Sequence, residues 1–294
     1  MYRVGILGTE NSHAMAFAKT MNTKNEKGEY NYPDFRVTAL YALEKSPSEE
    51  IVKACPETEI KIVSSPEEML PLVDCVMVTS RHGKYHLPFA KPFIKAGMPC
   101  FIDKPVTISV EDTRELLALA AENKVPLIGG SGCKFSPELL EMKTEIAEGK
   151  VGKLYSGIIN FPAELESEYG GMYFYGSHLV EMAMTAFGSD ILSVSAFASS
   201  EGHLTAVARY TKYDIILNFV RNYQYIAIAY GAGGNIVKNP NIGGIYESEV
   251  KHFVDMIRTG KSAISTDDLV KPVYVLNAIE KSLAEKREVA LSEF

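Results

Sequence analysis

An aspartate, a lysine and a proline stand together at residues 103–105, directly after the apolar run of residues 98–102. This order predicts that Lys104 lies on a turn at the carboxyl end of a strand, where open α/β sheets bind their ligands. Proline keeps the residue before it out of helical geometry, so we expect Lys104 to be extended and its amine to reach into a crevice. Such an amine can exchange a proton with a ligand. The alternative is a solvated lysine that only ends a strand.

The size and composition of the chain indicate a globular protein of two domains. At 294 residues the chain is near the length at which a single hydrophobic core stops growing. Its apolar fraction of 46% and charged fraction of 23% are ordinary for soluble proteins. The net charge of −7 argues against nucleic acid or an anionic membrane as a partner, because both require a basic face.

The cysteines and the first residues indicate the compartment. The four cysteines, Cys55, Cys75, Cys100 and Cys133, have no CxxC spacing, so we expect reduced core residues rather than disulfides or metal ligands. The apolar start at residues 1–8 is too short for a signal segment or a membrane span. We therefore expect a cytoplasmic protein.

Residues 1–128 alternate short apolar runs with helical patterns, as parallel sheets with crossover helices do. The expected strands span residues 2–7, 36–41, 60–63, 75–79, 100–102 and 125–128. The expected helices span residues 14–21, 47–54, 66–72, 87–96 and 110–123. This order predicts a Rossmann-like, doubly wound α/β domain that binds a dinucleotide.

The pattern changes near residue 150. Alternating segments follow one another with few helices between them, at residues 154–160, 191–199, 204–210, 214–219 and 225–230. They predict an open, mostly antiparallel sheet built from hairpins. Helical patterns return at residues 176–187, 246–259 and 267–285. We therefore predict an α+β domain over residues 129–294, whose C-terminal helices pack back on the first domain.

Several motifs, taken in order, resemble the glucose-fructose oxidoreductase, inositol dehydrogenase and MocA-like family. The run from Val73 to Thr79, then His86, Ala96-Gly97 and Asp103-Lys104-Pro105, is similar to the family's strand, threonine, histidine, Ala-Gly and Glu-Lys-Pro series, with Asp for Glu. Lys134 to Pro137 is similar to its Arg-x-x-Pro, and Gly176 to His178 to its Asp-x-Gly-x-His. Their order and spacing carry the resemblance, which covers nearly the whole chain.

The resemblance implies hydride transfer between NAD or NADP and a hydroxyl or carbonyl of a sugar, inositol or related polyol. It implies that Lys104 and His178 contact the reacting hydroxyl and that one of them takes its proton. The alternative for His178 is a core histidine on an apolar helix face. The implied substrate residues are Lys134, Tyr175 and Glu181. The implied cofactor residues are Gly8, Thr9, Asn11, Ser12, Glu44, Thr79, His86, Asp103 and Lys104.

The phosphate loop departs from the family pattern. Three glycines in Gly-x-Gly-x-x-Gly let the backbone approach a pyrophosphate, but residues 8–13 read Gly-Thr-Glu-Asn-Ser-His and keep only the first. A carboxylate at Glu10 would repel phosphate, so either its side chain turns outward or the cofactor binds differently. Asn11 and Ser12 are suited to capping the helix and donating to phosphate. His13 is either a ligand contact or a helix-face histidine.

Two further departures concern the ribose and the substrate. Ala42 stands where an acid usually binds the adenosine ribose; Glu44 is the nearest acid, and the following Lys45 suits a 2′-phosphate equally well. The sequence therefore does not distinguish NAD from NADP as the cofactor. Phe174 stands at the family's aspartate, beside Tyr175. These departures leave a second hypothesis open, a non-catalytic relative that senses a ligand or binds a partner.

Metal binding and assembly complete the expectations. His82 and His86 have the i, i+4 spacing of two metal ligands, but a suitable third ligand is not near them in the sequence, so we expect no metal. Aromatic residues follow the strands of the second predicted sheet: Tyr210, Phe219, Tyr223, Tyr225 and Tyr230. We expect an exposed aromatic sheet face and a homo-oligomer formed through it.

Overall fold

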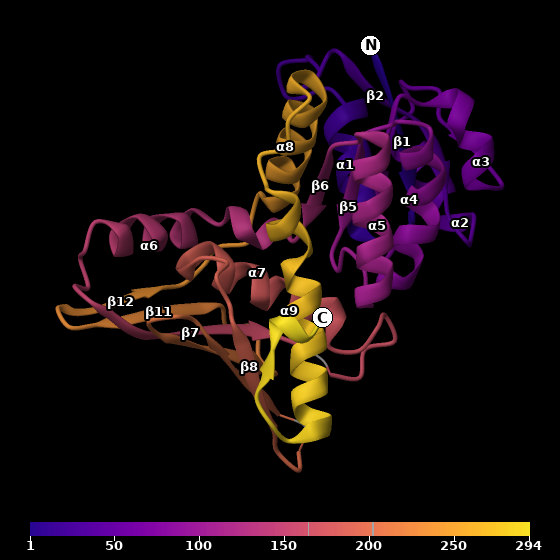
Figure 1. The fold of residues 1–294 in the computed structure, drawn as a ribbon. Coiled ribbons are helices and arrows are strands. Elements are labelled where there is room, and N and C mark those ends of the chain that lie inside the picture. The colour runs from indigo at the N-terminus through magenta and orange to yellow at the C-terminus, as the bar shows by residue number, and fades with distance from the viewer. Residues whose placement is uncertain (164, 202) are drawn as a thin grey trace. The chain divides into compact units, whose positions relative to one another are not determined.

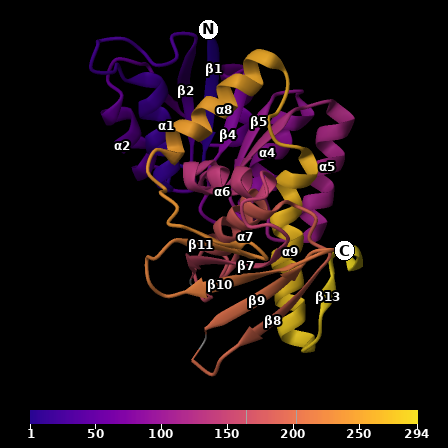
Figure 2. The same ribbon diagram turned by 90° about the vertical axis from the view of Figure 1, so that its left-hand side faces the viewer.

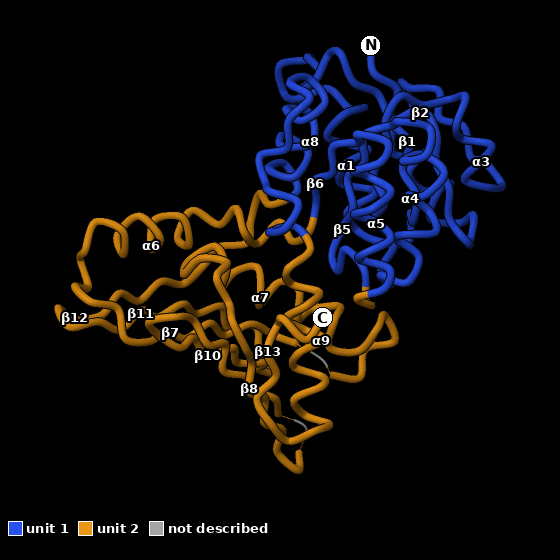
Figure 3. Tube along the Cα trace, in the orientation of Figure 1, with its two compact units in different colours: residues 1–107, 111–129, 246–269 blue, residues 108–110, 130–245, 270–294 orange. Residues whose placement is uncertain are grey.

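The computed structural model describes residues 1–163, 165–201 and 203–294. These residues form two compact units, shown in blue and orange in Figure 3. The first unit takes residues 1–107, 111–129 and 246–269, and the second takes residues 108–110, 130–245 and 270–294. Each unit is therefore built from segments that lie far apart in the sequence.

The first unit contains a six-stranded sheet in the order β3-β2-β1-β4-β5-β6. The registers from β3 through β5 are parallel, and the direction of winding reverses between β1 and β4. This topology confirms the predicted doubly wound fold and puts a switch point beside β1. The strands are β1 (Tyr2–Leu7), β2 (Phe35–Tyr41), β3 (Lys61–Ile62), β4 (Cys75–Val78), β5 (Cys100–Asp103) and β6 (Leu127–Gly130).

Helices cover this sheet through apolar faces. In α1 (Ser12–Asn22), Ala14, Phe17 and Met21 are buried at helical spacing. The helix α8 (Ile245–Thr259) lies beside α1 in Figures 1 and 2 and shares its core. The Phe17 and Phe101 rings meet edge to face at 5.3 Å between centroids. The other helices of the unit are α2 (Ser46–Ala54), α3 (Pro66–Met69), α4 (His86–Lys95) and α5 (Val110–Asn123).

The second unit contains a seven-stranded sheet in the order β12-β11-β7-β10-β9-β8-β13. Most neighbours are antiparallel, as predicted, but β7 and β10 run parallel. The expectation of hairpins alone is therefore wrong, because parallel neighbours require a crossover connection. The strands are β7 (Leu154–Pro162), β8 (Ser193–Ala198), β9 (Leu204–Arg209), β10 (Asp214–Val220), β11 (Ile226–Gly231), β12 (Gly234–Lys238) and β13 (Val289–Ala290).

Three helices belong to this sheet: α6 (Pro137–Ala147), α7 (Tyr173–Phe187) and α9 (Thr266–Glu285). Figure 1 shows α6 and α7 on one side of it. Side chains alternate along the central strands β7, β9, β10 and β11, so about every second residue there is buried against that layer. The opposite face carries an apolar row in register across five strands, formed by Val237, Ile228, Ile158, Ile216 and Val207.

The expected aromatic face is only partly present. Tyr210 and Phe219 are buried, because Phe219 points into the core and the Tyr210 hydroxyl donates to the Gly188 carbonyl at 2.9 Å. Tyr223 and Tyr230 are exposed. The open face of the sheet is therefore mainly aliphatic. Among the described helices, none is long and apolar enough to cross a membrane.

The turn after β1 requires glycine. Gly8 has a φ of +90°, and a Cβ there would lie 2.3 Å from the Ser80 nitrogen. We expect Gly8→Ala to lower the free energy of unfolding by more than about 2 kcal/mol, measured by urea denaturation. Gly28→Ala is the matched control: its φ is +77°, but nothing lies within 4 Å of the added Cβ, so about 1 kcal/mol is expected. Equal losses would show that crowding by Ser80 is unimportant.

Candidate functional site

The loop between β1 and α1 holds four of the implied cofactor residues, and the structure gives each a contact within the first unit. The Thr9 hydroxyl hydrogen-bonds the Ser48 hydroxyl at 2.8 Å. Asn11 is the residue before α1, but its side chain does not cap the helix. Its amide instead donates to Asp103 Oδ2 at 2.9 Å. The Ser12 and Tyr246 hydroxyls lie 3.0 Å apart. The expectation that Asn11 caps α1 is therefore wrong, because Asp103 competes for its side chain.

Glu10 has a partner that explains its place in this loop. Its carboxylate accepts the Arg81 backbone N–H at 3.1 Å. A cavity of ≈ 580 Å³ lies at this end of α1, and both Glu10 and Arg81 line it, together with Thr9, Asn11, Ser12 and Lys19. The cavity carries charge of both signs, from Lys19 and Arg81 and from Glu10 and Glu50. The N-terminus of α1 beside it favours anions.

Thr79 and His86 form hydrogen bonds to the backbone at the ends of β1 and β4, beside the switch point. The Thr79 hydroxyl donates to the Gly8 carbonyl at 2.9 Å, and His86 Nε2 lies 2.7 Å from the Ser80 carbonyl. Burial lowers the pKa of His86 to about 4, so its ring is neutral. His82 precedes the short 3₁₀ helix Gly83–Tyr85 and accepts the Lys84 N–H, so it does not share a helix face with His86. Glu44 is exposed in the connection between β2 and α2.

Asp103 and Lys104 stand at the carboxyl end of β5, where the sequence predicted them. Asp103 is fully buried and accepts hydrogen bonds from the Asn11 amide and, at 2.7 Å, from the Lys104 backbone N–H. Lys104 is also buried, with 2% of its surface exposed, and its peptide bond to Pro105 is cis. A solvated lysine that only ends a strand is thus not what the structure shows.

The second unit brings together a separate polar cluster. His178 and Glu181 lie one turn apart on α7, so both face the same way. His178 Nδ1 lies 2.6 Å from the Ser131 hydroxyl, and the Ser131 backbone N–H donates to Glu181 Oε1 at 2.6 Å. Lys134 forms an ion pair with Glu181. Of these residues, sequence reasoning missed Ser131, because the predicted strand ended at residue 128, whereas β6 runs to Gly130 and puts Ser131 directly after it.

This polar cluster is buried, and the backbone beside it leaves no room for a side chain at residue 130. Ser131, His178 and Glu181 are all buried. Burial raises the pKa of Glu181, while the charge of Lys134 opposes that rise. Gly130 has a φ of +73°, and a Cβ there would lie 2.6 Å from Glu181 Oε1. A side chain at residue 130 would therefore displace the ion pair.

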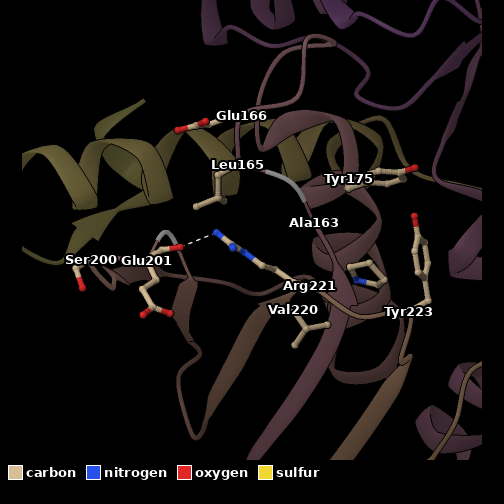
Figure 4. Close-up of a pocket in the computed structure, with 10 residues that line it drawn as sticks. Ala163, Leu165, Glu166, Tyr175, Ser200, Glu201, Val220, Arg221 and Tyr223 are labelled. Carbon is tan, nitrogen blue, oxygen red and sulfur yellow. Dashed lines mark hydrogen bonds between the residues drawn. The ribbon is translucent and has the colours of Figure 1, made fainter.

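Aromatic side chains surround the His178 end of α7. The Phe174 ring, which replaces the family's aspartate, packs against Tyr175 with centroids 4.7 Å apart, and Tyr175 lies 5.9 Å from the His178 ring. Tyr175 also lines a cavity of ≈ 680 Å³, shown in Figure 4. Arg221 also lines this cavity, and its guanidinium donates to the Glu201 carbonyl at 2.6 Å (Figure 4). Lys134 and Glu181 are not among the described residues that line this cavity.

The chain is similar in sequence to known oxidoreductases. Residues 2–131 match the family described as "Oxidoreductase family, NAD-binding Rossmann fold". The oxidoreductase YdgJ of Escherichia coli is 26% identical over 64% of this chain, and the match spans 62% of its own length. The scyllo-inositol 2-dehydrogenase (NAD(+)) of Bacillus subtilis is 24% identical over 69% of this chain and 73% of its own.

Solved structures show the same fold. The scyllo-inositol dehydrogenase of Lactobacillus casei, solved with NAD(H) and scyllo-inositol, has a TM-score of 0.81 at 14% identity, over 99% of both chains. A myo-inositol dehydrogenase from Corynebacterium glutamicum has a TM-score of 0.78 at 18% identity, also over 99% of both chains. Residues 2–131 are therefore similar to the oxidoreductase family with an NAD-binding Rossmann fold, and the chain as a whole has the fold of the inositol dehydrogenases.

Proposed function

We propose that this protein is an NAD(P)-dependent oxidoreductase that transfers hydride between a nicotinamide and a hydroxyl or carbonyl of a sugar, inositol or related polyol. The observation that carries the proposal is Lys104, buried at the carboxyl end of β5 in a doubly wound sheet. The inositol dehydrogenases among the relatives support the substrate class.

The cofactor would be held by the start of α1. Asn11 and Ser12 stand at the N-terminus of α1, where backbone N–H groups favour a phosphate, and Gly8 and Thr9 form the turn before it. Lys19 and Arg81 line the cavity there and offset Glu10, whose carboxylate is already engaged by a backbone N–H. When bound, the nicotinamide accepts or supplies the hydride.

Proton transfer is assigned to Lys104 and His178. Ser131 Oγ accepts the Cys133 N–H at 3.1 Å, so its own proton is available to His178 Nδ1. That hydrogen bond orients the imidazole ring of His178 for proton transfer. Lys134 and Glu181 form a buried polar anchor for a substrate hydroxyl, and Tyr175 offers a ring face and a hydroxyl.

We also propose a cytoplasmic homo-oligomer formed through the second sheet. The aliphatic row from Val237 to Val207 lies on the face opposite α7. Tyr230, two residues beyond Ile228 on the same face of β11, exposes 39% of its surface. Apolar surface of this kind usually marks an interface.

A bound cofactor should stabilise the fold. We expect at least one of NAD, NADH, NADP and NADPH to raise the midpoint of thermal unfolding, since a ligand at 100 times its Kd adds about 2.7 kcal/mol. Arg81→Ala should reduce the shift, and Lys53→Ala, which removes an exposed lysine of α2, should not. No shift with any of the four would contradict the proposal and favour a non-catalytic relative.

Loss of either proton-transfer residue should lower turnover. With the cofactor found above and a panel of inositols and sugars, we expect Lys104→Met and His178→Asn each to lower kcat by about 10²–10⁴-fold. His178→Asn should keep the thermal shift with cofactor, which separates lost chemistry from lost folding. Wild-type turnover in both variants would refute the assignment.

The bond from Ser131 predicts a change in pH dependence. A donor to Nδ1 stabilises the neutral imidazole, so Ser131→Ala favours the protonated ring, and the acid limb of the pH profile of kcat should move to higher pH. Ser177→Ala is the matched control, because the buried Ser177 hydroxyl donates to the Tyr173 carbonyl in the same helix. An unmoved limb in Ser131→Ala would show that Ser131 does not act on His178.

A further inference from the structure

Two departures from the family pattern meet in the first unit, although they are far apart in the sequence. His13 stands where the phosphate loop has its third glycine, and Asp103 stands where the lysine motif has glutamate. His13 Nδ1 lies 3.5 Å from Asp103 Oδ2, and His13 Nε2 lies 3.6 Å from Glu249 Oε2. The start of α1, the end of β5 and α8 thus each contribute one ligand-type side chain to one cluster, in which the two carboxylates face different nitrogens of the imidazole.

This cluster is buried. His13, Asp103 and Glu249 expose 5%, 0% and 2% of their surfaces. Neither ring nitrogen of His13 has a hydrogen-bond partner among the described residues. Buried polar atoms are nearly always paired, and an exception calls for a ligand, an ion or a water. The Tyr246 ring, 4.7 Å from the imidazole between centroids, closes one side of the cluster.

The imidazole does not itself neutralise the carboxylates. Burial, helped by the charge of Lys104, lowers the pKa of His13 to about 3, so the ring is neutral at pH 7. A neutral imidazole is the form that binds a metal. Asp103 is held in place by the Asn11 amide, as carboxylate ligands are usually oriented by a second hydrogen bond.

We propose that His13, Asp103 and Glu249 bind one divalent transition-metal ion, with Zn²⁺ as the best match. One ligand atom of each residue lies within 4.8 Å of the others. Zinc takes imidazole nitrogen and carboxylate oxygen at about 2.0–2.2 Å, so one ring nitrogen of His13 binds the ion and the carboxylate that faces the other nitrogen turns to join it. The ion joins α8 to the phosphate loop and to β5.

The test is metal binding by the full-length protein. After treatment with a chelator, calorimetric titration with Zn²⁺ should show one ion per chain, and the ion should raise the midpoint of thermal unfolding. His13→Ala and Glu249→Gln should each weaken binding at least tenfold and abolish the thermal shift. His203→Ala, which removes an exposed imidazole of the second unit, should change neither.

Two outcomes would overturn the proposal. The first is no stoichiometric Zn²⁺ binding and no thermal shift in the wild-type protein. The second is equal binding by wild type and both cluster variants, which would mean adventitious surface binding. Glu249→Gln preserves side-chain volume, so the comparison stands even if His13→Ala fails to fold. Neither readout requires turnover, so the result is independent of the proposed dehydrogenase activity.

Discussion

The carboxylate of Asp103 is fully buried at the end of β5, and a buried carboxylate must be met by donors. Asn11 meets it from the loop before α1, and the backbone N–H of Lys104 meets it from the next residue. This demand fixes the start of α1 against the end of β5. The positions of Lys104 and of the loop between β1 and α1 both depend on it.

A buried carboxylate that requires hydrogen-bond donors also organises the second unit. Glu181 is buried on α7, and it is met by the Ser131 backbone and by Lys134. Because the Ser131 backbone N–H is bonded to Glu181, the Ser131 hydroxyl lies within hydrogen-bond distance of His178 Nδ1. In both units a buried acid organises the basic residue to which the proposed chemistry is assigned. Removing either acid would leave its donors unpaired, which is costly in a low-dielectric interior.

The departures from the family pattern form consistent local structures. Glu10 turns to a backbone N–H of Arg81. Phe174 joins an aromatic group with Tyr169 and Tyr175. His13 fills the space that a third glycine would leave open and meets two carboxylates. Each of these side chains therefore has a specific environment in the structure.

The sequence by itself determined the fold and the placement of single residues on it. Apolar runs of strand length alternating with helical patterns specify a doubly wound sheet, since each element must bury one face. Asp103 and Lys104 were placed correctly at the carboxyl end of a strand, because the residues that follow an apolar run of strand length lie where that strand ends. The alternation of buried and exposed residues along the strands was also predictable. Tyr210 and Phe219, however, were expected on the exposed face of the sheet and are buried.

Only the tertiary structure decided which distant residues meet. The periods of helix and strand say which face a side chain occupies, but not which other segment lies opposite that face. For that reason Ser131 was missed as the partner of His178, and Asn11 was expected to cap α1 rather than to bind Asp103. Glu249 belongs to a helix near the end of the chain, yet it packs in the first unit beside His13. Long-range packing alone brought these side chains together.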